Sequence, residues 1–206
     1  MRDSRRAITG ANLRSILRRR PERPPMKSPA ALLAAVLFLL AACVPSSRRL
    51  APTAAEPATT VYLVRHAEKA SGTAPGLTPA GTARAAAYPT FFSETDLAAV
   101  YTTPTRRTRA TAQPLADAKR LPLVEYASDA DVGAFAKTLL ATHAGETVFV
   151  VGHSNTVPAI ANALLGEERY GNIDHEDYEQ VIQVIKRGEA PGEGRVFRLS
   201  FPHGTR

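Results

Sequence analysis

Short apolar runs alternate with longer segments of helix length along residues 60–201 of this 206-residue chain. The runs are rich in valine and aromatic residues, which predicts strands. The longer segments begin with helix start signals such as Thr78 followed by Pro79 and predict helices. The expected strands are 60–64, 98–102, 121–126, 147–151, 180–186 and 195–201, and the expected helices are 79–92, 104–120, 129–143 and 156–165.

The order of these elements predicts the fold class. Strands and helices alternate over the first two thirds of the region, so we expect a mostly parallel sheet covered on both faces, a three-layer α/β/α sandwich. The last two runs are separated by a turn-like stretch at 187–194 and predict a hairpin. Pro114 lies inside the helix 104–120 and should kink or restart it.

An apolar run at 30–42 precedes the domain and has the features of a secretory signal. It is too short to span a bilayer comfortably, follows a basic start and ends in small residues. The Leu-Ala-Ala-Cys ending resembles the lipobox of bacterial lipoproteins, and Cys43 is the only cysteine. This resemblance implies cleavage before Cys43, lipidation of its sulfur and a membrane anchor. An ordinary signal peptide or an uncleaved anchor is the alternative.

The chain therefore divides into parts with different expected roles. They are a basic extension (1–25), a lipoprotein signal peptide (26–42), a flexible tether rich in Pro, Ala, Ser and Thr (43–58) and a folded domain (59–206). Met1 and Met26 both stay open as the start of translation. Val44 does not match the aspartate retention signal, so we expect the periplasmic face of the outer membrane of a bacterial envelope.

The positive net charge of +7 comes from the leader. Residues 1–42 hold nine of the 26 basic and two of the 19 acidic residues, which leaves 17 of each in the remainder. A formally neutral domain lacks the basic surface that nucleic-acid binding needs, so we expect no nucleic-acid partner.

Two histidines directly follow strand-like runs. His66 comes after Val61-Tyr62-Leu63-Val64-Arg65, and His153 comes after Val148-Phe149-Val150-Val151-Gly152. Open α/β sheets place their ligand sites at the carboxyl ends of strands, so both imidazoles should share one site. Since a neutral imidazole is a nucleophile or a general acid and base, the pair indicates group transfer through a histidine.

Arginines accompany both histidines. Arg65 precedes His66, and Arg107 lies in the segment 102–112 that follows the second expected strand. Arginine binds phosphate through a fork of donors, and the helix that starts near Thr156 adds its positive end. A dianionic phosphate is the ligand that such a pocket would bind best.

These motifs resemble the histidine phosphatase superfamily, which includes the cofactor-dependent phosphoglycerate mutases. The Arg-His-Gly signature of the family appears as Arg65-His66-Ala67, with alanine in the glycine position. Its Ser-Pro-x-x-Arg-Ala-x-x-Thr-Ala segment appears as Thr-Pro-Thr-Arg-Arg-Thr-Arg-Ala-Thr-Ala at 103–112, and His153 matches its second histidine. The resemblance spans about residues 60–165.

The resemblance implies a phosphatase that hydrolyses phosphomonoesters and has the phosphoglycerate mutase-like fold. His66 would be the nucleophile that becomes phosphohistidine, and Arg65, Arg107 and His153 would hold the phosphate oxygens until water attacks. Asn155 would donate to the phosphate or orient His153, or would only cap a helix. The substrate class stays open between a phosphorylated small molecule and a phosphoprotein.

The proton donor for the leaving group is the weak point of the site. The resemblance implies a carboxylic acid between Arg107 and His153, and the candidates are Glu125, Asp129 and Asp131. Glu125 ends an expected strand and ranks first. Asp129 equally suits a helix N-cap, and a site without a clear acid is the remaining alternative.

Other polar residues receive plainer interpretations. Glu68 either orients Arg65 or is solvated, His143 suits a helix carboxyl end, and His175 lies in an acidic stretch expected to be a solvated loop. His203 lies near the terminus. No histidine and carboxylate cluster has metal spacing, so we expect neither a metal nor another cofactor.

Two rival functions remain. The segment 150–156 also resembles the nucleophile elbow of serine hydrolases with Ser154 as nucleophile, although Thr156 replaces the second glycine of that motif. The other rival is an envelope lipoprotein that binds a phosphorylated ligand without turning it over, which Ala67 and the missing clear acid leave open. A mutase is less expected. The phosphoglycerate mutases of the family continue their first motif with a tryptophan and asparagine segment, and this chain contains no tryptophan.

Overall fold

The structure is a computed structural model and describes residues 56–128 and 131–200. The expected leader, the lipidation site Cys43, Asp129 and His203 lie outside the described residues. No helix in the described ranges is long and apolar enough to cross a membrane.

Six strands of the described ranges form a single sheet. They are β1 (Ala58–Arg65), β2 (Ala99–Thr102), β3 (Leu123–Glu125), β4 (Thr147–Gly152), β5 (Gln180–Arg187) and β6 (Glu193–Arg198). The order across the sheet is β3-β2-β4-β1-β5-β6. The first four in this order run parallel, and β5 and β6 form an antiparallel hairpin beside β1. The prediction of a mostly parallel sheet with a final hairpin is confirmed.

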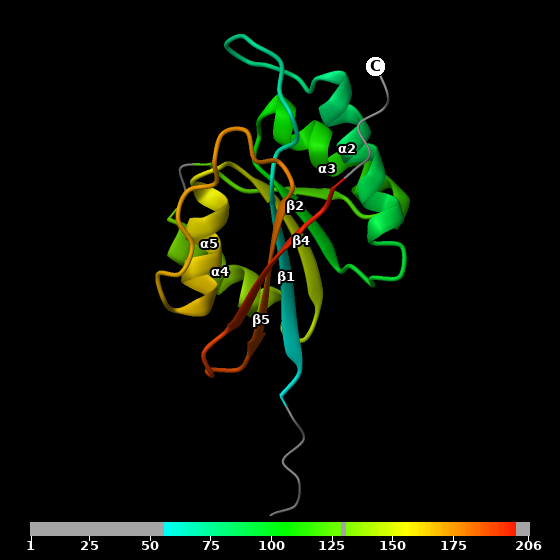
Figure 1. Ribbon diagram of the computed structural model, residues 1–206. Helices are drawn as coiled ribbons and strands as arrows, with labels where there is room; N and C mark the ends of the chain where they lie inside the picture. The colour runs from blue at the N-terminus through cyan, green and yellow to red at the C-terminus, as the bar shows by residue number, and fades with distance from the viewer. Residues whose placement is uncertain (1–55, 129–130, 201–206) are drawn as a thin grey trace, which may run out of the picture. The chain divides into compact units, whose positions relative to one another are not determined.

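In the part of the chain that the structure describes, four helices cover the two faces of this sheet. They are α2 (Pro79–Phe91), α3 (Arg106–Lys119), α4 (Val132–Thr142) and α5 (Thr156–Leu165). Figure 1 shows α2 and α3 on one side of the sheet and α4 and α5 on the other. The predicted three-layer α/β/α architecture is therefore confirmed.

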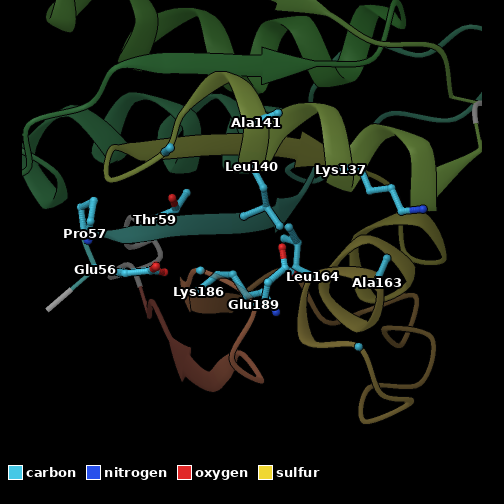
Figure 2. Close-up of a pocket in the computed structure, with 13 residues that line it drawn as sticks. Glu56, Pro57, Thr59, Lys137, Leu140, Ala141, Ala163, Leu164, Lys186 and Glu189 are labelled. Atoms are coloured by element: carbon cyan, nitrogen blue, oxygen red, sulfur yellow. The ribbon is translucent and has the colours of Figure 1, made fainter. Parts of the chain in front are cut away.

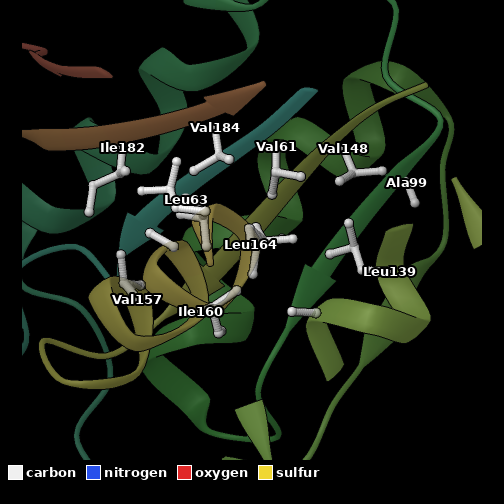
Figure 3. Close-up of a cluster of buried hydrophobic side chains, with 14 of the residues drawn as sticks. Val61, Leu63, Ala99, Leu139, Val148, Val157, Ile160, Leu164, Ile182 and Val184 are labelled. Atoms are coloured by element: carbon white, nitrogen blue, oxygen red, sulfur yellow. The ribbon is translucent and has the colours of Figure 1, made fainter. Parts of the chain in front are cut away.

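Alternate residues of the central strands pack into different layers, as the period of a strand requires. Val61 and Leu63 of β1 belong to a core shared with α4 and α5, where Leu139 and Ile160 are fully buried (Figure 3). Val64 belongs to the core on the opposite face. Burial on both faces explains why β1 reads as a continuous apolar run.

Local capping fixes where the helices begin. The Thr78 side chain accepts from the Gly81 amide, so α2 begins at the predicted residue. The Asp131 carboxylate caps α4 in the same way, so this helix begins later than its expected start at 129. The helix α3 continues through Pro114, so the expectation of a restart there is wrong.

Candidate active site

The two histidines predicted from the sequence meet at one edge of the sheet. Arg65, the last residue of β1, pairs in register with Gly152, the last residue of β4, and the His66 amide donates to the Gly152 carbonyl oxygen at 2.9 Å. The ring centroids of His66 and His153 are 5.7 Å apart. Arg107 reaches the same edge from the first turn of α3. The sequence prediction that these four side chains converge is consistent with this geometry.

His66 is buried and held in one tautomer. Its Nδ1 lies 2.8 Å from the Ala67 carbonyl oxygen, which can only accept, so Nδ1 carries the proton and Nε2 keeps its lone pair. Burial lowers the pKa of His66 to about 4, against the effect of the Ala67 carbonyl and with help from the charges of Arg65 and Arg107. The imidazole is therefore neutral near pH 7 and presents a nucleophilic nitrogen.

Alanine is accommodated where the family motif has glycine. The Ala67 amide donates to the Thr111 hydroxyl of α3 at 2.9 Å, and its methyl group is fully buried. Among the described non-glycine residues only Arg120 has a positive φ, so the backbone of Ala67 does not need the freedom of glycine. The substitution leaves the Nδ1 contact of His66 intact.

His153 has protein partners on both ring nitrogens. Arg107 Nη2 can only donate, so His153 Nδ1, at 3.3 Å, accepts and Nε2 carries the proton. That Nε2 lies 3.0 Å from the Thr103 hydroxyl, which in turn contacts the Thr108 hydroxyl at 2.9 Å. Burial, together with the charges of Arg107 and Arg65, lowers the pKa of His153 to about 4. In this arrangement His153 orients Arg107.

A cluster of fully buried threonines supports the site and was missed as a functional feature. The Thr108 hydroxyl donates to the Thr103 carbonyl oxygen at 2.8 Å, and the Thr111 hydroxyl donates to the Arg107 carbonyl oxygen at 2.8 Å. These hydroxyls connect α3 to the loops that carry His66 and His153. The available signal was the high density of threonines over residues 102–111. Buried hydroxyl groups need hydrogen-bond partners, so such a density indicates a hydrogen-bonded cluster.

Arg65 is buried, and its guanidinium is held by the chain that follows α5. Its Nη1 donates to the carbonyl oxygens of Asp174 at 2.8 Å and His175 at 2.7 Å, and more distantly to that of Asp177 at 3.5 Å. Its Nη2 lies 3.4 Å from the Tyr178 hydroxyl, and its Cζ lies 4.3 Å from the centroid of that ring.

Residues 173–178 are therefore part of the site, which corrects the expectation that they form only a solvated loop. The side chain of His175 is exposed, but its carbonyl oxygen binds Arg65. The Ile173 amide donates to the Ser154 carbonyl oxygen at 2.9 Å, which ties this segment to the loop after β4. No pattern in the acidic sequence points to backbone carbonyls, so residue types alone could not reveal this role.

The two arginines share a feature that is found nowhere else in the described ranges. The Nε atoms of Arg65 and Arg107 are the two buried side-chain polar atoms without a hydrogen-bond partner. A buried N–H without a partner costs free energy, so native proteins seldom retain one unless a ligand or water completes it. Both donors belong to the pair of guanidinium groups beside His66.

Glu125, the first-ranked acid, lies at the surface. Its side chain is 42% exposed, and its Oε1 accepts from Arg109 Nε at 2.5 Å. That hydrogen bond lowers the pKa of Glu125. A carboxyl group that is ionised more readily than usual is a poor proton donor, so the geometry does not favour its predicted role as the general acid.

The remaining carboxylates near the motifs have structural partners. Asp131 accepts from the amides of Gly133 and Ala134 as the N-cap of α4. Glu68 forms a bidentate salt bridge with buried Arg84 at 2.7 Å, so the expectation that it orients Arg65 is wrong. Its motif position was misleading, because the partner comes from the buried side of α2, 16 residues further along the chain.

Two residues after His153 bear on the alternative functions. Asn155 occupies the N-cap position of α5, but its side chain makes no capping hydrogen bond and is exposed. Its amide is therefore available to a ligand. Ser154 has no positive φ, and neither His66 nor His153 hydrogen-bonds to its hydroxyl. These are not the features of an activated serine nucleophile.

Among the described residues, cavities also lie away from the cluster of histidines. One of about 570 Å³ lies at the amino end of β1, where Thr59, Leu140 and Lys186 line it (Figure 2). Its lining residue Thr59 lies six residues before Arg65 on β1, which corresponds to roughly 20 Å at the rise of a strand. The other, of about 770 Å³, runs along α5 from Asn155 to Gly166. In the described part of the chain, no group of His, Cys, Asp and Glu side chains could hold a metal ion.

Comparisons with known proteins point to similarity with one family. The family model of the histidine phosphatase superfamily (branch 1) matches residues 61–128, which include the Arg65-His66 motif and Arg107. No curated protein matches the sequence. The family model and the solved structures with this fold support the resemblance that the motifs indicated.

Solved structures share the fold at low sequence identity. The protein histidine phosphatase SixA complexed with tungstate aligns with a TM-score of 0.57 and 18% identity over 68% of this chain and 96% of that one. A mycobacterial glucosyl-3-phosphoglycerate phosphatase aligns with a TM-score of 0.58 and 15% identity over 69% and 100%. Phosphoserine phosphatase from Entamoeba histolytica in complex with 3-phosphoglyceric acid aligns with a TM-score of 0.51 and 18% identity over 69% and 98%.

Proposed function

We propose that this domain is a phosphatase that hydrolyses phosphomonoesters through a phosphohistidine on His66. The observation that carries the proposal is the pair of buried, unpartnered Nε donors on Arg65 and Arg107 beside a neutral imidazole with a free Nε2. A tetrahedral oxyanion would complete both donors at once. The fold of phosphatases with solved structures supports the same class of reaction.

The proposed reaction has two displacements at phosphorus. The Nε2 lone pair of His66 attacks, the bond from phosphorus to the ester oxygen breaks, and the alcohol leaves with a proton from an acid or from water. Water then attacks the phosphohistidine, the N–P bond breaks, and inorganic phosphate and a proton are released. The arginines stabilise the charge on the oxygens of the phosphoryl group during both steps.

The substrate belongs to the proposal only as a class. Neighbouring structures include a protein phosphatase and phosphatases of small metabolites, so a phosphorylated small molecule and a phosphoprotein both remain candidates. The groove along α5 begins at Asn155, whose free amide makes it a candidate contact for the phosphate or for the group attached to it.

Hydrolysis of p-nitrophenyl phosphate tests the proposal. We expect the wild type to release phosphate, His66→Ala to lose activity to background, and Arg107→Ala to lose about 100-fold or more in kcat/KM. Arg109→Ala is the matched control from the same helix and should retain activity. Quenching in alkaline detergent with a ³²P-labelled substrate should trap a label on the protein that is stable in alkali and lost in acid, as a phosphohistidine is.

Three measurements separate this proposal from the serine hydrolase and the non-catalytic lipoprotein. Full activity in His66→Ala would overturn the phosphohistidine mechanism, and labelling of Ser154 by a fluorophosphonate would favour the serine hydrolase. Tungstate binding without any turnover would favour the lipoprotein that only binds a phosphorylated ligand.

We also propose that the protein is anchored by a lipid on Cys43 at the periplasmic face of the outer membrane. The support is the lipobox-like Leu-Ala-Ala-Cys sequence that follows the apolar run at 30–42. Fractionation of cells that express the wild type or Cys43→Ala tests it. The wild type should stay with outer membranes. Mass spectrometry should find a lipid on the wild type and none on the variant, and equal lipidation of both would refute the assignment.

A further inference from the structure

All the described hydrogen-bond partners of the Arg65 guanidinium are neutral groups. Three backbone carbonyl oxygens, from Asp174, His175 and Asp177, face its Nη1. The Asp177 carboxylate is engaged elsewhere, because it binds Arg198 at 2.9 Å and Gln180 at 2.7 Å. Carbonyl oxygens satisfy donors without neutralising the cation, so the charge of Arg65 stays available to an anion.

The occupied side of the guanidinium decides which edge remains free. The Nε–H and one Nη2–H of an arginine lie on a common edge, which is the edge that binds two oxygens of a phosphate. Since carbonyl oxygens hold Nη1 and Nε has no partner, the free edge of Arg65 is the Nε/Nη2 edge.

Tyr178 completes the support from the face of the guanidinium. Its half-buried ring lies 4.3 Å from Arg65 Cζ, within the range of a cation–π contact, and its hydroxyl lies 3.4 Å from Nη2. The same ring is 6.3 Å from the His66 ring, so it stands beside the nucleophile. A planar support on one face prevents rotation of the guanidinium about its last side-chain torsions.

Residues 173–178 are themselves fixed at both ends. The Ile173 amide binds the Ser154 carbonyl oxygen at 2.9 Å, and the Asp177 carboxylate accepts from the Glu179 amide at 3.1 Å as well as from Arg198 of β6. The segment therefore joins the loop after β4 to the β5–β6 hairpin and crosses Arg65 between them.

We propose that Tyr178 is a positioning residue that, with the carbonyl groups of Asp174, His175 and Asp177, aims the Nε/Nη2 edge of Arg65 at the oxyanion beside His66. The inference rests on the proposed function in that this oxyanion is the transferred phosphoryl group. The π face, rather than the hydroxyl or the bulk of the side chain, carries the effect, because the hydroxyl contact is long and the ring contact is close.

Tungstate binding, measured by calorimetry on the intact protein, tests the proposal without requiring turnover. Tyr178→Phe keeps the ring and should bind tungstate within about twofold of wild type. Tyr178→Leu keeps apolar bulk but has no π face, and its Kd should rise about five- to tenfold. Tyr170→Leu, a half-buried tyrosine of the same connection, is the matched control and should leave the Kd unchanged.

Steady-state kinetics with p-nitrophenyl phosphate and thermal melting complete the test. KM should rise in Tyr178→Leu by about the same factor as the tungstate Kd, kcat should change less, and Tyr178→Phe should restore KM. If folded Tyr178→Leu binds tungstate like the wild type, or if Tyr178→Phe is as impaired as Tyr178→Leu, the positioning role is wrong. Wild-type binding of tungstate without turnover would reject the proposed function and leave the positioning role standing.

Discussion

Single imidazoles in this site have pKa values far from that of an exposed histidine. Burial lowers the pKa of both His66 and His153 to about 4, from an ordinary value of 6.5. The unfolded chain therefore binds more protons than the folded one between pH 6.5 and 4. The contribution of each neutral histidine to stability is complete above pH 6.5 and is lost as the pH falls toward 4.

This linkage predicts that acid destabilises the wild type more than a variant without the titrating ring. The urea midpoint of the wild type should fall between pH 6.5 and 4, and His66→Gln should show a shallower fall over the same range. The His175→Gln variant is the control, because its imidazole is exposed. Parallel profiles for wild type and His66→Gln would show that His66 is not held neutral.

Glu125 gives a second prediction at this scale. Its exposed carboxylate is paired with Arg109, so Glu125→Gln should change kcat/KM by less than about threefold for both p-nitrophenyl phosphate and a slower alkyl phosphate. The alkyl ester matters because its poor leaving group depends most on a proton donor. A large loss confined to the alkyl ester would restore Glu125 as the general acid despite its pairing.

Helix α3 positions the nucleophile loop through a hydroxyl. The fully buried Thr111 accepts from the Ala67 amide and donates to the Arg107 carbonyl oxygen, so one side chain joins two site motifs. Thr111→Val keeps the shape but leaves the Ala67 amide without a partner, which should cost about 1–3 kcal/mol in the free energy of unfolding.

Urea denaturation of Thr111→Val and Thr111→Ser measures this cost. Serine keeps the hydroxyl and should lose clearly less stability than valine. Activity should follow the same order, because the loop that carries the Nδ1 contact of His66 moves when its amide loses the hydroxyl. Equal stability of valine and wild type would mean that the contact contributes nothing.

Elements were predictable where period and capping agree. The valine run of β4 and the glycine stop of α5, which ends at Leu165 before the C-cap Gly166 with φ 80°, match their predicted ranges closely. The side chains of His66, His153, Arg65 and Arg107 could be grouped because parallel strands end at one edge. The helix α3 does not restart at Pro114, because the packing of α3 on α2 outweighs one lost hydrogen bond.

The role of residues 173–178 could not be predicted from the sequence for a different physical reason. Arg65 is bound there by main-chain carbonyls, which every residue type carries, and the contact joins positions 109 and 110 residues apart. Glu68 misled for a related reason, since its partner Arg84 was one of several available arginines. Such pairings are decided by tertiary packing rather than by local pattern.

At the scale of the whole molecule, the site draws on the ends of β1 and β4, on α3, and on the segment before β5. An oxyanion that bridges Arg65 and Arg107 therefore links parts of the fold that are distant in sequence. A ligand that binds only the folded state stabilises it by about 2.7 kcal/mol at a concentration 100 times its Kd. Tungstate should therefore raise the Tm of the wild type by several degrees.

The same linkage makes the melting shift a measure of each arginine. Arg107→Ala should lose most of the tungstate-dependent shift, because it removes a buried donor that has no other partner. Arg109 lies two residues further along the same helix, is exposed and pairs at the surface with Glu125. Arg109→Ala should therefore keep the wild-type shift. Equal losses in both variants would mean that tungstate responds to the general charge of α3. Loss in Arg107→Ala alone would tie oxyanion binding, and with it the stability of the whole domain, to the buried Nε donor.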